Sequence, residues 1–408
     1  MHNSPAREKR IPLEVGTPQS AGDSDSTSVS STPISTPLST PIVATAGITA
    51  WLDTTLEELV QPELFVSYPA KDPVDLATQI MTTKQLTCLP LTNAEGDVVE
   101  YLDYSHLNCY LLLVLGRVEP AGNRADFHAQ AEQVRKGIPS SAEFAAQLGA
   151  VDPIVRMPVS STLSAAVRQF AAGVHRIACV DTNDRVVGVL SQRRMVKYVW
   201  TNIKKFPLLE AFLDKPLGEL PIGTYQEMIT VQGDAPLLDA LSLMHDETVS
   251  SVAVVDREKN LLGNISVADV SLLTRGAQTP LLAQPCKHFL TVILENRGLV
   301  DGKDVVPVFY VDRQTKLGLI IAKMVATKAH RLWIVEQRDP DAISSGKLVG
   351  VVSLTDVLNF LARQGGSFLD PESARRHRRS SSSSVRSNSR ARMGASPHSS
   401  HMRPSLHN

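Results

Sequence analysis

The sequence predicts an α/β fold made of four copies of one small unit, and three observations support this. An apolar strand, a polar turn, a second apolar strand and a helix recur four times along the chain. A stretch with helical spacing of apolar residues precedes each copy. With 408 residues and 43% hydrophobic content, the chain is also too long for one ordinary core, so two or more domains are expected.

The four copies keep the same internal register. Their first strands are expected at 87–91, 175–180, 251–255 and 330–335, and their second strands with the following helix starts at 98–106, 186–194, 261–270 and 348–358. Copy one is the weakest, and Glu100 replaces the glycine of the other copies, so its turn into the helix should differ. One unit of about sixty residues buries too little apolar surface to be secure alone, so the copies should pair.

Two polar tails, 1–46 and 365–408, flank the folded middle and hold too few large apolar residues to offset the entropy of ordering, so we expect both to be disordered. The run of arginines and one histidine at 375–379 is compatible with a nuclear-import or nucleic-acid patch, and equally with a solvated tail that kinases modify. Candidate phosphorylation sites precede prolines or lie in the serine run: Thr17, Thr32, Thr36, Thr40, Ser380, Ser381, Ser382, Ser383, Ser384 and Ser396.

Composition excludes several classes of protein and site. A formal charge of -1 gives the molecule no overall attraction to nucleic acid or to an anionic membrane. The longest apolar run, 110–115, is far shorter than the ~20 residues of a membrane span, and the polar N-terminus is unlike a signal peptide. The cysteines form no C-x-x-C pair, which predicts a reducing compartment and no metal site. We therefore expect a cytoplasmic and nuclear protein.

An enzyme is not expected. The chain contains no G-x-S-x-G, no H-E-x-x-H and no paired zinc-ligand spacing. The segment 298–304 resembles a P-loop but is one residue short and lacks the Ser or Thr that holds magnesium, so we interpret it as a turn.

Copies three and four share a Ser-x-x-Asp spacing, Ser266 to Asp269 and Ser353 to Asp356. An isolated motif of this kind is typical of a helix capping box, in which the hydroxyl and the carboxylate satisfy free backbone N–H groups. The motif recurs at the same place in copies three and four.

The order of strand, turn and G-h-h-S/T-x-x-D resembles the CBS domain, and four copies arranged as two pairs resemble the gamma subunit of the AMP-activated protein kinase. With its two tails, the chain resembles the fungal Sds/Moc family of four-CBS proteins. The resemblance implies four tandem CBS repeats forming two paired (Bateman) modules between disordered tails. The expected division is a tail at 1–46, degenerate copy one at 47–120, copy two at 121–208, copy three at 209–282, copy four at 283–364 and a tail at 365–408.

The resemblance also implies the ligand and its residues. The ribose of AMP, ADP or ATP is expected at Asp356 and Asp269 with Ser353 and Ser266. Phosphate groups are expected at the two His-Arg pairs, His330 with Arg331 and His175 with Arg176. Three weaker candidates are Arg193, Ser250 and Ser251. Copies one and two depart from the pattern, because His106 and Arg194 stand at the ribose position, so one or two nucleotides per chain are expected.

The same resemblance implies that the protein is an inhibitor of type 2A-like Ser/Thr phosphatases, acting in cell-cycle, stress and nutrient control. Its expected partners are phosphatase catalytic subunits, adenine nucleotide and kinases that modify the tails, without a membrane or nucleic acid. The alternative is a nucleotide-sensing gamma-type subunit of a protein kinase complex. The preferred nucleotide, the phosphatase and the oligomeric state are not predicted.

Overall fold

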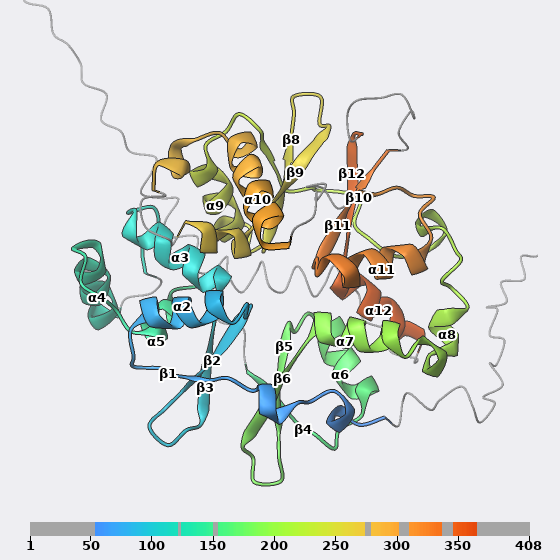
Figure 1. Ribbon diagram of the computed structural model, residues 1–408, viewed down its shortest axis with the longest axis horizontal. Coiled ribbons are helices and arrows are strands. Elements are labelled where there is room, and N and C mark those ends of the chain that lie inside the picture. Colours follow the sequence, from blue (N-terminus) through green and yellow to red (C-terminus); the bar gives the residue numbers. More distant parts are fainter. Residues whose placement is uncertain are drawn as a thin grey trace, which may run out of the picture. The chain divides into compact units, whose positions relative to one another are not determined.

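The computed structural model describes residues 54–120, 124–149, 154–273, 279–301, 310–336 and 346–364. Both predicted tails, with all of their candidate phosphorylation sites, lie outside these residues. Within the described residues the fold is α/β and repeats four times, as predicted (Figure 1).

Each copy forms a three-stranded sheet, in which a short first strand runs parallel to the second and the second pairs antiparallel with the third. The short strand that opens each sheet was not predicted, because two to four residues leave no periodic signal. The two strands that the sequence predicts for each copy are the second and third strands of its sheet. In chain order the sheets are β1 (Tyr68–Pro69), β2 (Cys88–Thr92) and β3 (Val98–Asp103); β4 (Val155–Pro158), β5 (Arg176–Val180) and β6 (Val186–Ser191); β7 (Thr230–Gln232), β8 (Ser251–Val255) and β9 (Leu261–Ser266); and β10 (Tyr310–Val311), β11 (Arg331–Val335) and β12 (Leu348–Ser353).

One helix joins the first strand to the second, and another follows the third strand. The joining helices are α2 (Val74–Thr83), α6 (Leu163–Ala171), α9 (Leu237–Asp246) and α11 (Leu317–Thr327). The following helices are α3 (Tyr104–Val114), α7 (Gln192–Thr201) and α12 (Leu354–Gln364), and copy three has the 3₁₀ helix η5 (Val267–Leu272) in this place. Each following helix begins directly after its strand, so the strand's last residue is the N-cap, where Ser and Asp are favoured.

Segments between the copies pack on a copy that is not always the nearest in sequence. In the first half, η1 (Leu56–Glu58) lies on copy two through a Thr55–Thr162 bridge, whereas α5 (Ala142–Leu148) lies on copy one through Pro73–Ser141. The second half repeats this exchange with η4 (Leu217–Glu219) on copy four and α10 (Cys286–Asp301) on copy three. The remaining elements are α4 (Ala125–Arg135), α8 (Pro207–Glu210), η2 (Pro62–Leu64), η3 (Ile203–Lys205) and η6 (Thr279–Ala283). The predicted domain borders stay predictions. The predicted border at 120/121 assigns α5 to copy two, whereas α5 packs on copy one.

The expected turn at 298–304 is wrong in its first part. Residues 298–301 form the last turn of α10, and 302–304 lie outside the described residues. A single interior glycine such as Gly298 costs a helix only about 1 kcal/mol relative to alanine, which the rest of α10 outweighs.

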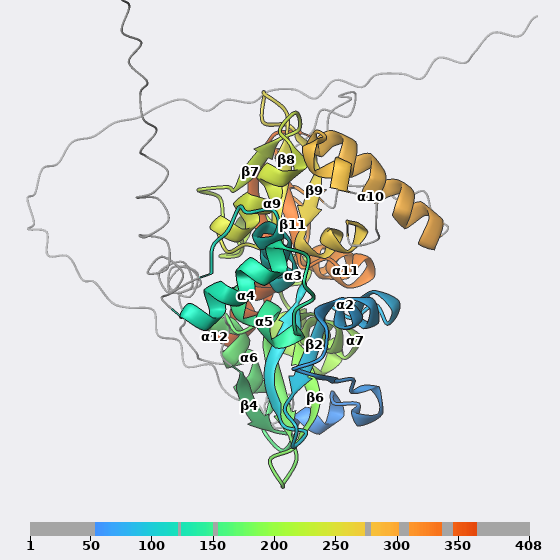
Figure 2. The same cartoon turned by 90° about the vertical axis from the view of Figure 1, so that its left-hand side faces the viewer.

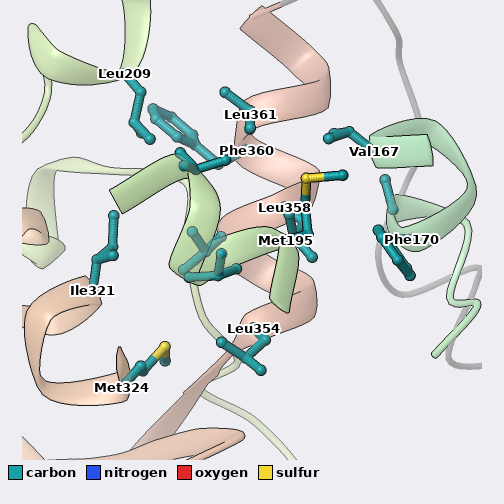
Figure 3. Packing of buried hydrophobic residues seen from close by; sticks show 14 of the residues in the cluster. Val167, Phe170, Met195, Leu209, Ile321, Met324, Leu354, Leu358, Phe360 and Leu361 are labelled. Carbon is teal, nitrogen blue, oxygen red and sulfur yellow. The ribbon is translucent and has the colours of Figure 1, made fainter. Parts of the chain in front are cut away.

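Two large hydrophobic cores hold the copies together through their helices. One core joins copies two and four and includes Phe170 of α6, Met195 of α7 and Leu358 of α12 (Figure 3). The other joins copies one and three and includes Leu112 of α3 and Leu241 of α9. Figure 2 shows α3 with its neighbours α4 and α5 from the side.

The sheets meet in a second direction, through two smaller clusters. Tyr101 of β3 packs with Ala178 of β5, which joins the sheets of copies one and two. Val255 of β8 packs with Trp333 of β11, which joins the sheets of copies three and four. Sheets therefore pair one with two and three with four, as expected of two modules, whereas helices pair one with three and two with four.

Candidate functional site

The two Ser-x-x-Asp motifs adopt the same geometry at their helix starts. The backbone nitrogen of Ser353 donates to Asp356 Oδ2 at 2.8 Å, and Ser353 Oγ donates to the same oxygen at 2.7 Å. Ser266 donates to Asp269 Oδ2 at the same two distances. The carboxylates are only 5% and 7% exposed. The capping interpretation is therefore correct for both, and since a carboxylate offers about four acceptor positions, capping is compatible with binding ribose hydroxyls.

Copy one exchanges the two roles. Asp103 stands at the serine position and accepts from the backbone nitrogens of Ser105 and His106 at 2.8 and 3.2 Å. His106 Nδ1 lies 3.2 Å from the Asp103 backbone nitrogen and 3.1 Å from Asp103 Oδ1, so it accepts from the backbone when neutral and donates to the carboxylate when protonated.

Burial alone would raise the pKa of Asp103, but His106 and Arg176 outweigh it, and the pKa lies well below its usual range. Burial would lower the pKa of His106, but Asp103 outweighs it and the pKa is raised. This helix start therefore holds an ionised Asp103 carboxylate bonded to His106 and Arg176 in place of a ribose carboxylate.

In copy two, Arg194 at the ribose position is held by another part of the chain. Ser191 accepts from the Arg194 backbone nitrogen at 3.3 Å, as a cap, and the Arg194 side chain donates to Gln61 Oε1 at 2.6 Å. The expectation that copies one and two differ from copies three and four at the ribose position agrees with this geometry.

Five predicted phosphate ligands form what we call the basic cluster: His175, Arg176, Arg193, His330 and Arg331. The His330 residue is exposed to solvent, although protein atoms surround part of its side chain. This partial desolvation lowers the pKa of His330, and the four other members of the cluster lower it further because they repel a proton. The five side chains therefore share one electrostatic environment, although they come from two distant parts of the sequence.

The helix starts of copies two and four place this cluster beside the Asp356 motif. Thr355 Oγ1 donates to Gln192 Oε1 at 3.1 Å, and Gln192 Nε2 donates to the Val174 carbonyl at 2.9 Å. Because Thr355 precedes Asp356 and Gln192 precedes Arg193, this bond holds the two N-termini side by side. Burial lowers the pKa of Arg193, whose side chain is half-buried. A buried carboxylate and several cationic groups at two adjacent helix starts can bind a ligand with hydroxyl groups at one end and phosphates at the other.

The two arginines of the His-Arg pairs cross between paired copies. Arg331 donates to Ser250 Oγ at 2.6 Å and to the Ser251 carbonyl at 3.2 Å, so Ser250 reaches the cluster with its side chain and Ser251 with its backbone. Arg176 donates to Asp103 Oδ2 at 2.8 Å and to the Thr87 carbonyl at 3.4 Å. The roles of all these residues toward a ligand stay predictions.

Two residues beside Asp356 were missed from the sequence. The Tyr225 ring is half-buried, with the Arg313 guanidinium 4.4 Å from its centroid. Burial raises the pKa of Tyr225, Arg313 lowers it, and Asp356 raises it, which brings the ring and the carboxylate into one neighbourhood. Backbone bonds of 2.8 and 2.9 Å between Thr224 and Val351 fix the segment on β12. An aromatic residue in a linker gives no periodic signal that could have indicated this role.

The described residues offer little support for a metal site, a membrane span or reactive thiols. No group of three His, Cys, Asp or Glu side chains there is placed to hold a metal ion. Among the same residues, no helix is long and apolar enough to cross a membrane. All four cysteines are free thiols, and burial raises the pKa of Cys88, Cys109 and Cys286 to about 12 and that of Cys179 to about 11, so these thiols are unreactive.

Comparison with known proteins identifies the repeat. The CBS domain family model matches residues 146–201, 222–273 and 303–363, which fall in copies two, three and four. Protein SDS23 of Yarrowia lipolytica is 44% identical over 366 residues, which cover 83% of this chain and 72% of the relative. Protein sds23 of Aspergillus niger is 36% identical over 393 residues, covering 82% and 77%.

A solved structure is similar over most of the chain. Protein MJ1225 of Methanocaldococcus jannaschii, proposed as an archaeal homologue of g-AMPK, superposes with a TM-score of 0.57 at 14% identity and covers 75% of this chain and 99% of its own. At that identity the likeness concerns the fold alone.

Proposed function

The chain belongs to the SDS23 family of CBS-domain regulatory proteins, and from this premise we propose that it binds an adenine nucleotide where copies two and four meet. The observation that carries the proposal is the Thr355–Gln192 bond, which sets the buried Asp356 beside the basic cluster. Asp356 would accept hydrogen bonds from the ribose hydroxyls, and the half-buried Tyr225 ring would pack on the adenine. Arg193, Arg331 and His330 would face the phosphates.

The electrostatics of the cluster favour an anionic ligand. Desolvation lowers the pKa of His330, and the four other basic side chains lower it further because they disfavour another positive charge there. A bound phosphate would relieve this repulsion. The cationic side chains that the fold brings together would therefore favour its binding. Asp269 in copy three, with the same geometry as Asp356, would hold the ribose of a second nucleotide.

Calorimetric titration of AMP, ADP and ATP into the full chain tests the site. Replacing Asp356 by Asn should weaken binding at that site at least tenfold, because charge-assisted hydrogen bonds contribute about 1.5–3 kcal/mol each. The Asn variant keeps an oxygen that can accept from the Ser353 backbone nitrogen, so the fold should persist. Asp97→Asn, at an exposed carboxylate in the β2–β3 turn, is the matched control. A folded Asp356→Asn protein that titrates like the parent would reduce Asp356 to a cap.

In a nucleotide-bound structure, Arg194 and His106 should make no ribose contact. Gln61 and Asp103 already hold these two side chains. A ribose hydroxyl on either side chain would overturn the expectation of one or two nucleotides.

The resemblance to the Sds/Moc family extends the proposal to inhibition of type 2A-like Ser/Thr phosphatases, in the cytoplasm and nucleus. The repeated body would dock on the phosphatase, and phosphorylation of the tails would tune that contact. A protein spanning 47–365 and the full chain should inhibit a type 2A phosphatase alike. Inhibition by the full chain alone would move the activity to the tails, and inhibition by neither would remove this role. A pull-down that instead recovers kinase catalytic subunits would favour the gamma-type alternative.

A further inference from the structure

We propose that Asp103 is an internal anion that occupies the Arg176 guanidinium, so that the interface between copies one and two holds a carboxylate in place of a ligand phosphate. The inference rests on the proposed function only in assigning Arg176 to a phosphate-binding cluster. It makes Asp103 the residue that restricts which of the two pairs of copies accepts an anion.

The position of Asp103 has a counterpart in the sheets of copies three and four, so the residues at this position can be compared directly. It pairs with the first residue of the second strand, Cys88, as Ser266 pairs with Ser251 and Ser353 with Arg331. A serine hydroxyl at this position carries no charge. Copies three and four carry their carboxylates three residues later, at Asp269 and Asp356, whereas copy one carries its carboxylate at the end of the strand.

The two arginines that cross between paired copies have matching positions. Arg176 reaches Thr87, which precedes β2, and Arg331 reaches Ser250, which precedes β8. Beyond this shared contact, Arg176 forms an ion pair of 2.8 Å with Asp103 Oδ2, whereas the residue at the matching position in copy three is Ser266. The ion pair with Asp103 therefore places an internal carboxylate on the arginine that crosses between copies one and two.

The Asp103 pair is shielded enough to compete with a ligand. The two side chains are 17% and 14% exposed, so solvent screens their attraction less than it would at the surface. Asp103 Oδ1 caps α3 and Oδ2 binds Arg176, so one rigidly held side chain performs both tasks. An incoming phosphate would have to displace Asp103 from Arg176 and approach its negative charge.

The test uses sodium tripolyphosphate, which has phosphate groups but no adenosine, with the full chain and three variants. Asp103→Ser gives copy one the residue of copies three and four, and Asp103→Asn removes the charge while keeping a favoured cap. Asp97→Ser removes an exposed carboxylate in the β2–β3 turn, at the other end of β3. Calorimetry should show that both Asp103 variants bind tripolyphosphate roughly tenfold tighter than the parent, because an arginine freed of its carboxylate forms charge-assisted bonds with the anion. Adding Arg176→Gln to either variant should remove the gain.

Thermal unfolding supplies a second readout. The Asp103 variants should lose stability, since Arg176 and His106 lose a buried counter-ion, and tripolyphosphate should restore more of it than sodium chloride at equal ionic strength. If Asp103→Ser does not fold, Asp103→Asn carries the test. Unchanged tripolyphosphate affinity in a folded Asp103 variant overturns the inference, as does an equal gain in Asp97→Ser. A gain at Asp103 supports it even if Asp356→Asn leaves nucleotide binding unchanged, which would count against the proposed nucleotide site alone.

Discussion

His330 is the residue that couples the cluster to protons. Its depressed pKa means that the unfolded chain takes up a proton near pH 6.5 while the folded protein does not, so this histidine reduces stability as the pH falls below about 6.5. A bound phosphate places negative charge beside the ring and raises its pKa. Nucleotide and proton should therefore bind cooperatively at this residue.

We expect nucleotide affinity to increase as the pH falls from 7 to 5, with net proton uptake on binding. Calorimetric titrations in buffers of different ionisation enthalpy measure that uptake directly. His330→Asn should abolish it, whereas His288→Asn, at an exposed position on α10, should leave it unchanged. Proton uptake that persists in His330→Asn would assign the coupling to another group.

The site was predictable at the residue level only where a motif repeats. Asp269 and Asp356 could be selected because Ser-x-x-Asp recurs in register, and the basic residues because the His-Arg pair recurs. Tyr225 and Arg313 could not, since they lie far apart in sequence and meet only because a linker crosses onto copy four. The Asp103–Arg176 bond was also out of reach, because it depends on how two sheets pack.

At the scale of elements, the glycine in the third strand of copies two and four lets a linker approach closely. A Cβ at Gly350 would lie 2.8 Å from the Thr224 carbonyl oxygen and 2.9 Å from Tyr225 Cδ1. At Gly188 the nearest atom would be a methyl of Val60, at 2.7 Å, which belongs to a side chain. At Gly350 the added Cβ would meet backbone that two hydrogen bonds hold in place. At Gly188 it would meet the side chain of Val60 on a short linker.

Gly350→Ala should therefore destabilise the protein by about 1–3 kcal/mol, as overpacking typically does, and should also weaken nucleotide binding by displacing Tyr225. Gly188→Ala should cost less stability and leave nucleotide affinity nearly unchanged. Chemical denaturation and nucleotide titration of both variants give the comparison. Equal effects of the two substitutions would contradict the proposed role of the Thr224–Tyr225 segment.

A helix or strand was predictable where its pattern of apolar residues extended over enough positions. The second and third strands follow the predicted ranges, because runs of Val and Ile mark them. The short first strands and the exchange of η1 and α5 between copies were not predictable, since they follow from contacts between distant residues such as Thr55 and Thr162. The same limit explains the wrong turn at 298–304, where α10 continues through Gly298.

At the scale of the whole body, each of the two large cores of the described residues draws on both halves of the chain. The helices of copy two bury their apolar faces against copy four, and those of copy one against copy three. The sheets join copies in the other direction, one with two and three with four. A perturbation in one copy should therefore reach the copy across the helical core, which is the route by which a ligand at Asp356 could influence a partner bound elsewhere.

Leu358→Ala tests this coupling, because Leu358 of α12 is fully buried beside Met195 and Val167 of copy two (Figure 3). Removing a buried leucine side chain costs about 2–5 kcal/mol, and the loss should appear in both copies that share the core. Hydrogen exchange should show reduced protection in α6 of copy two as well as in α12. Leu319→Ala, at a position on α11 that is 52% exposed, is the control and should change neither helix. Loss of protection confined to copy four would show that the copies unfold independently, and an effect of nucleotide on a distant partner would then need a route other than this core.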